Sequence, residues 1–204
     1  MEAETRERAA RRRIVLFAAL AAGIVFAAVG AFVWTLGSSD SGTPASEPAG
    51  STAGQGSAGT VTPAGPTIVS AAALRAAAKQ NEAPLYWAGT RSAARIEYTR
   101  RSDGTTFVRY LTGGARAGDP GAGYVVVATY PQTDAYERVS TIAHEKGFAT
   151  TELSDGGGLA VVKPGSPANI HVVYRDQPYQ VEVYAPTAKV ARQLVFGGAI
   201  TPVG

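Results

Sequence analysis

The sequence predicts an α+β protein with one transmembrane helix, a flexible linker, and then a largely antiparallel sheet with about three packing helices. Three observations predict this class: an uncharged apolar segment at 14–36, a Gly/Ser/Thr/Pro-rich stretch at 37–66, and short β-forming runs separated by tight turns in 67–204. Short connections favour antiparallel pairing, and helices on the sheet complete a core. We therefore expect a basic cytoplasmic tail at 1–13, a transmembrane helix, a disordered linker and one extracytoplasmic domain of residues 67–204.

Residues 14–36 have the length and polarity of a bilayer span. These 23 residues carry no charge, and a hydrocarbon core about 30 Å thick needs about 20 apolar helical residues. Five arginines lie within 1–13 and the next basic residue is Arg75, so the N-terminus should be cytoplasmic and the C-terminal domain extracytoplasmic. A cleaved signal peptide is the competing interpretation, but its apolar core would span only about 7–15 residues. We expect a single-pass protein of the cell membrane that contacts the lipid bilayer through 14–36.

Charge and composition argue against several functional classes. The formal net charge is +3, of which the tail contributes +2 (five arginines against three glutamates) and the rest of the chain only +1 (fourteen basic against thirteen acidic residues). This distribution does not predict nucleic-acid binding. The chain has no cysteine, which removes thiol nucleophiles, thiolate metal ligands and disulfides. We expect no nucleic-acid partner and no cofactor.

Caps, turns and β-forming runs predict the elements of the outer domain. Helices are expected at 70–80, with Ser70 as N-cap, at 133–146 after a Thr133 or Asp134 cap, and at 186–195. Gly147 and the Gly197-Gly198 pair should end the last two helices. Strands are expected at 85–88, 95–101, 105–112, 124–130, 148–153, 159–163, 169–175 and 179–184.

The hairpin joining 95–101 to 105–112 allows two registers. A three-residue loop places Ile96 and Tyr98 on one face with Val108 and Tyr110, whereas a two-residue loop pairs Ile96 with Leu111. We favour the three-residue loop because it segregates apolar from polar side chains better.

The last hairpin places His171 opposite Glu182. A histidine facing a carboxylate could act as a general acid–base pair, but a solvated cross-strand pair is the more common arrangement, and no nucleophile or second ligand can be placed beside it. His144-Glu145 lacks the second histidine of a zinc-peptidase helix, since Phe148 occupies that position. We therefore predict no catalytic residue and no metal site.

Arginines and aromatic residues alternate in the first half of the outer domain, around residues 86–116. Such a surface could bind an anionic wall polymer, a lipid headgroup or an acidic protein face. The competing interpretation is a solvated arginine-rich strand face with the aromatic rings in the core. Together with the last hairpin, this gives the candidate ligand-binding residues Arg95, Arg100, Arg101, Arg109, His171 and Glu182.

Four runs of the outer domain, 84–89, 107–111, 129–131 and 157–161, are similar to phrases of an uncharacterised actinobacterial family of single-pass membrane proteins. The resemblance covers most of 67–204 and implies the location and an extracytoplasmic α+β domain, without active residues to transfer. We expect a noncatalytic binding or interaction module of the cell envelope, with an envelope protein or an anionic wall polymer as partner. The alternatives are a cell-envelope enzyme that uses the His171/Glu182 face and a signalling protein that relays outer-domain binding through its span.

Overall fold

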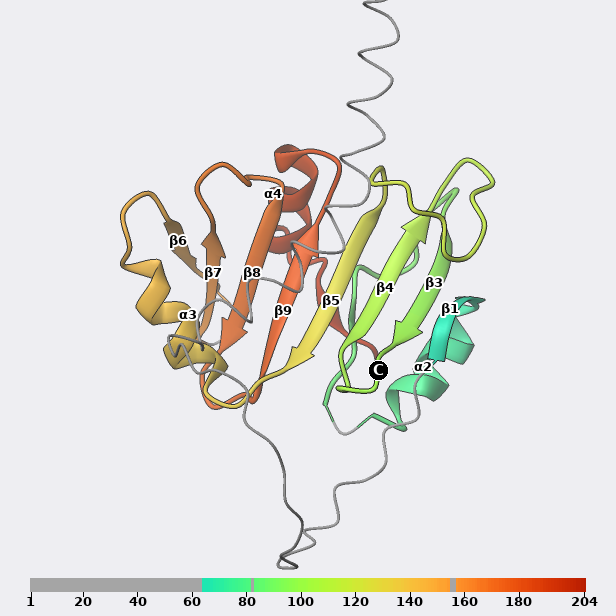
Figure 1. Ribbon diagram of the computed structural model, residues 1–204, viewed down its shortest axis with the longest axis horizontal. Coiled ribbons are helices and arrows are strands. Elements are labelled where there is room, and N and C mark those ends of the chain that lie inside the picture. The colour runs from blue at the N-terminus through green and yellow to red at the C-terminus, as the bar shows by residue number, and fades with distance from the viewer. Residues whose placement is uncertain (1–63, 82, 155–156) are drawn as a thin grey trace, which may run out of the picture. The chain divides into compact units, whose positions relative to one another are not determined.

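The computed structural model describes residues 64–81, 83–154 and 157–204. Its main feature is an antiparallel sheet of eight strands in the order β1-β3-β4-β5-β9-β8-β7-β6 (Figure 1). The strands, in sheet order, are β1 (Ala64–Val69), β3 (Arg95–Arg100), β4 (Thr106–Leu111), β5 (Val125–Pro131), β9 (Tyr179–Tyr184), β8 (Asn169–Tyr174), β7 (Gly158–Val162) and β6 (Ala149–Glu152). A separate antiparallel pair joins β2 (Tyr86–Trp87) to β10 (Thr201–Pro202).

Of the three short helices in the described residues, two begin after a residue whose side chain caps the helix. Ser70 caps α2 (Ala71–Ala78), because its Oγ accepts a hydrogen bond from the Ala73 amide at 3.1 Å. Thr187 caps α4 (Ala188–Phe196) in the same way. Asp134, by contrast, precedes α3 (Ala135–Ala143) in the left-handed conformation and makes no side-chain cap. The expected Ser70 cap is confirmed. The last helix, expected from residue 186, begins at Ala188.

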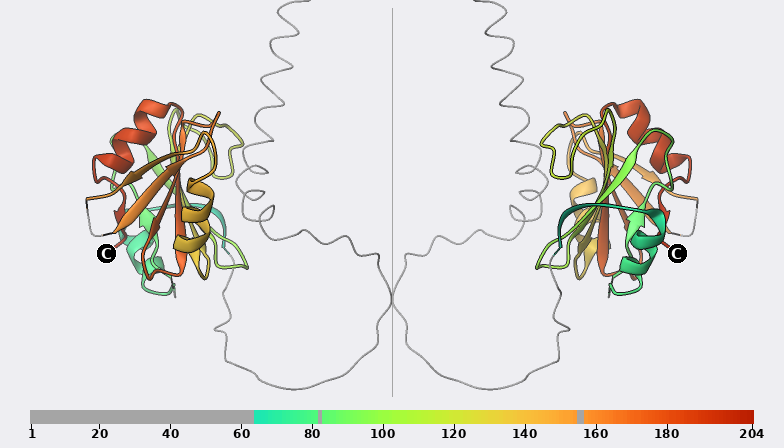
Figure 2. Two further views of the ribbon diagram at one scale, coloured as in Figure 1. Left: turned by 90° about the vertical axis from the view of Figure 1, so that its left-hand side faces the viewer. Right: turned by 90° about the vertical axis from the view of Figure 1, so that its right-hand side faces the viewer.

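The helices lie on both faces of the sheet, with α2 and α4 on one side and α3 on the other (Figure 2). The α2/α4 face carries the larger core, in which Leu74, Val127 and Val183 are at most 1% exposed. A smaller cluster beneath α3 contains Val139, Val161 and Val173. Because each fully buried aliphatic side chain contributes about 1.5–3 kcal/mol, packing can stabilise this cysteine-free domain.

The fold class predicted from the sequence needs correction. Within the described residues every pairing of the sheet is antiparallel, whereas the sequence predicted a largely antiparallel sheet. Three short helices accompany the sheet there. In the part of the chain that the structure describes, no helix has the length and apolar character needed to cross a membrane. The predicted tail, the span at 14–36 and the linker up to residue 63 lie outside the described residues.

The sequence did not predict β1, which begins within the last residues assigned to the linker. Pro66 and Gly65 argue against a central strand, but β1 is the edge strand next to β3, where a residue without an amide hydrogen is tolerated. The pairing also contains an irregularity between Ala64 and Thr67. The edge position therefore accommodates the single proline of β1.

Both predicted hairpin registers are confirmed. Ile96 lies opposite Tyr110 and Tyr98 opposite Val108, as the three-residue loop requires. Gly104 adopts φ +83° in that loop, a conformation that favours glycine. His171 lies opposite Glu182. These registers determine which side chains share each face of the sheet.

Candidate functional site

Arg109 belongs to a buried ion pair rather than to a solvated arginine face. Its Nη1 lies 2.7 Å from Glu97 Oε1, and the two side chains are 5% and 1% exposed. Arg109 Nη2 donates to the carbonyl of Asp119 at 2.6 Å, and the Gly118 amide donates to Glu97 Oε2 at 2.6 Å. The pair therefore holds the loop after β4 against the sheet. Arg95 contributes a further hydrogen bond, which it donates to the Ala115 carbonyl in the same loop.

His171 and Glu182 are also buried, at 5% and 3% exposure, so the expectation of a solvated pair is wrong. Helix α3 packs on β7, β8 and β9. The buried Glu182 carboxylate accepts hydrogen bonds from the Tyr130 hydroxyl at 2.7 Å and from the side-chain amide of Asn169. His171 Nδ1 lies 2.8 Å from Gln180 Nε2. Burial lowers the pKa of His171, although Glu182 acts in the opposite direction. The lowered pKa favours the neutral imidazole.

Arg100 and Arg101 are adjacent in the sequence but differ in exposure and surroundings. Arg101 is exposed and lies 3.9 Å from Asp103 across the β3–β4 turn. Arg100 is half-buried on the α2/α4 face and lines a pocket of about 480 Å³. The six predicted residues therefore do not form one site, and Arg100 is the member that faces a pocket.

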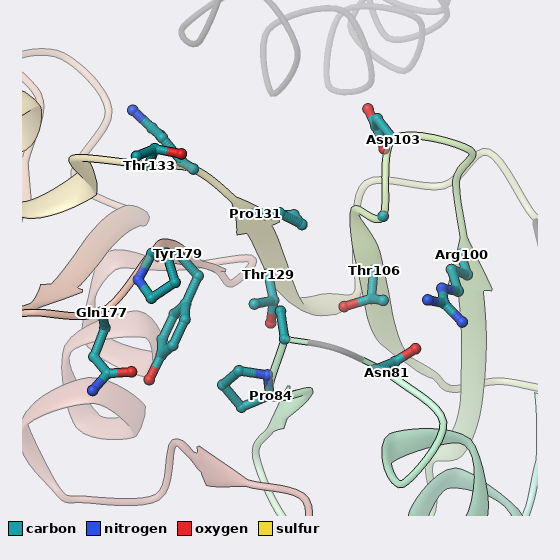
Figure 3. Close-up of a pocket in the computed structure, with 14 residues that line it drawn as sticks. Asn81, Pro84, Arg100, Asp103, Thr106, Thr129, Pro131, Thr133, Gln177 and Tyr179 are labelled. Atoms are coloured by element: carbon teal, nitrogen blue, oxygen red, sulfur yellow. The ribbon is translucent and has the colours of Figure 1, made fainter. Parts of the chain in front are cut away.

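The pocket lies at one end of β3, β4, β5 and β9, beside the connection from α2 to β2 (Figure 3). Arg100 and Thr106 are opposite each other in the β3–β4 pairing, and Thr106 is opposite Thr129 of β5. Asn81 comes from the α2–β2 connection and Gln132 from the residues after β5. Strand register thus places groups that are distant in the sequence around one space.

Polar atoms without a partner concentrate in this pocket. Of six buried side-chain nitrogen and oxygen atoms that lack a hydrogen-bond partner among the described residues, five belong to residues lining it. They are Arg100 Nε, Thr106 Oγ1, Gln132 Oε1 and both terminal atoms of Asn81. An unpaired buried polar group costs about 1–3 kcal/mol, so these groups favour a hydrogen-bonding partner in the pocket, either water or a ligand.

The opposite wall is more apolar and is held by its own hydrogen bonds. Pro84 and Pro178 line the pocket beside Tyr179, whose hydroxyl lies 3.0 Å from that of Tyr86. The Tyr86 amide donates to Thr129 Oγ1 at 3.3 Å. This combination of a fixed apolar wall and a few convergent polar groups is typical of small-molecule sites.

The sequence pattern indicated Arg100 but not Asn81, Thr106 or Gln132. These three residues belong to no sequence motif. Only the strand register and the path of the α2–β2 connection bring them close to Arg100. The chain matches no protein-family model, no curated protein and no solved structure.

Proposed function

We propose that this protein is a membrane-anchored extracytoplasmic binding module of the cell envelope, and that its ligand occupies the pocket around Arg100 and Thr106. The concentration of unpartnered buried polar atoms there carries the proposal. Thr106 lines the pocket although it is only 4% exposed, and its buried hydroxyl has no hydrogen-bond partner among the described residues. A ligand that bonds to these groups would recover the cost of burying them.

The enzymatic alternative gains no support from the His171/Glu182 pair. Both side chains are buried, and Glu182 already accepts hydrogen bonds from Tyr130 and Asn169. A substrate would have to displace these bonds to reach the carboxylate. The pair fits a structural role beneath the surface of the sheet better than a role in proton transfer to a substrate.

Photo-crosslinking tests the location of the binding site. Gln177 lies at the pocket rim in the exposed turn before β9, whereas Thr112 is exposed beyond the opposite end of β4, about 20 Å from Thr106 at strand spacing. With p-benzoylphenylalanine at each position of the full chain in its native envelope, we expect a covalent adduct from Gln177 and none from Thr112. Thr106→Val should reduce the adduct. Equal adducts at both positions, or an adduct unaffected by Thr106→Val, would contradict the proposal.

The proposed orientation rests on residues 14–36 and on the arginines that precede them. Because the chain contains no cysteine, single cysteines report topology without background. Ser102→Cys lies in the exposed β3–β4 turn and should react with a membrane-impermeant maleimide in intact cells. Thr5→Cys, in the N-terminal tail, should react only after permeabilisation. Labelling of both positions in intact cells, or of neither, would refute the orientation.

A further inference from the structure

We infer that the pocket ligand is a small molecule carrying a carboxylate, which pairs with Arg100. The inference rests on the proposed function and specifies its ligand. Arg100 is half-buried and makes no ion pair with any described residue, and its Nε is buried without a hydrogen-bond partner. Of the side chains available to proteins, the planar guanidinium fork matches a carboxylate best, because two parallel N–H···O bonds can form.

Among the described residues, no acidic side chain pairs with Arg100. Asp103 also lines the pocket, but its side chain is 57% exposed, faces Arg101 at 3.9 Å and accepts a hydrogen bond from the Thr105 amide at 2.9 Å. The pocket lining contains no second lysine or arginine among the described residues. One guanidinium balances the single charge of a carboxylate and can bind it through two parallel N–H···O bonds, whereas a phosphate group carries about −1.5 to −2 charges at pH 7.

The strand register places Thr106 beside Arg100 on the same face of the sheet. Arg100 and Thr106 are cross-strand partners, whose Cβ atoms lie about 4.5–5.5 Å apart in such a pair. Figure 3 shows Arg100, Thr106 and Asn81 close together from three segments, with the hydroxyl oxygen of Thr106 on the side of Thr129. Thr106 is therefore the residue beside Arg100 on the same face of the sheet, and its unpartnered hydroxyl is a second candidate group for the ligand.

The remaining groups specify a neutral polar part of the ligand. Asn81 offers both an unpaired donor and an unpaired acceptor, and Gln132 offers an unpaired carbonyl oxygen. These groups complement an amide or a hydroxyl, while Pro84 and Tyr179 provide apolar contact. Acylated amino acids and sugar acids both combine a carboxylate with such groups, and a pocket of about 480 Å³ accommodates either.

Matched pairs of charged and neutral probes test this ligand class. The full chain in detergent micelles is titrated with N-acetylalanine against N-acetylalaninamide and with glucuronate against glucose, while the arginine Nε–H resonances are followed by NMR. We expect the Arg100 resonance to shift with at least one carboxylate and not with its neutral counterpart. Arg100→Gln should weaken carboxylate binding about 10-fold or more, and Arg101→Gln, its exposed neighbour, should leave it unchanged.

The outcomes separate the ligand class from the proposed function. Which carboxylate binds distinguishes a peptide-like source from a sugar source. Equal binding of neutral and charged probes that is lost in Thr106→Val, or binding of inorganic phosphate alone, would overturn the carboxylate inference while supporting a pocket ligand. Failure of every probe to shift a resonance of the pocket, together with no Gln177 adduct in the envelope, would overturn both.

Discussion

Glu97→Gln should lower the free energy of unfolding by about 3–5 kcal/mol, the cost of leaving one partner of a buried ion pair uncompensated. The substitution preserves the shape of the side chain but leaves the Arg109 guanidinium, 5% exposed, without its counter-charge. The loop bond from Gly118 to Glu97 at 2.6 Å also loses the charge of its acceptor. Urea unfolding of the full chain, followed by circular dichroism, measures the change.

Two control variants separate this effect from a general sensitivity to charge. Arg101→Gln removes one partner of an exposed pair 3.9 Å apart and should cost less than about 1 kcal/mol. The double variant Glu97→Leu/Arg109→Met should be more stable than Glu97→Gln, because neither position then holds an uncompensated buried charge. A Glu97→Gln loss no greater than that of Arg101→Gln would show that the buried pair does not contribute as its geometry indicates.

This ion pair also shows where sequence reasoning was limited. The alternation of apolar and polar residues predicted the β3–β4 register and therefore the Ile96–Tyr110 pairing. It also placed Arg109 on the polar face, and a polar face was expected to be solvated. The loop after β4 covers that face through bonds to Glu97 and Arg109. A single sequence without conserved-pair information does not indicate where such a glycine-rich loop folds back.

Of the pocket residues, only Arg100 was predicted from the sequence, because the positions of the others depend on the paths of connections between elements. Arg100 was chosen for its charge, and strand periodicity assigns it to the apolar face with Tyr98. Its neighbours Asn81 and Gln132 lie in connections whose paths depend on how α2 and β5 leave the sheet. Local propensity predicts that such residues are in turns, but tertiary packing decides what their side chains face.

His171 also lies on a sheet face that was expected to be solvated and is buried instead. Its burial predicts how stability depends on pH. Burial lowers the pKa of His171 below the ordinary value of 6.5, Lys163 acts in the same direction, and Glu182 opposes them. Because the unfolded state takes up the proton first as the pH falls, the stabilisation from neutral His171 is complete above about pH 6.5 and is lost progressively below it. The expected slope reaches about 1.4 kcal/mol per pH unit between the unfolded and folded pKa values.

His171→Asn tests this slope, because asparagine retains a polar group near Gln180 but does not titrate. Unfolding free energies of the wild type and the variant are measured from pH 7.5 to about pH 5, and their difference cancels the contribution of groups that titrate alike in both. The wild type should lose stability on acidification faster than His171→Asn. His144→Gln, at an exposed position after α3, should retain the wild-type slope. Parallel curves for the wild type and His171→Asn would mean that Glu182 compensates the burial of the imidazole, so that His171 is protonated as readily in the folded sheet as in the unfolded chain.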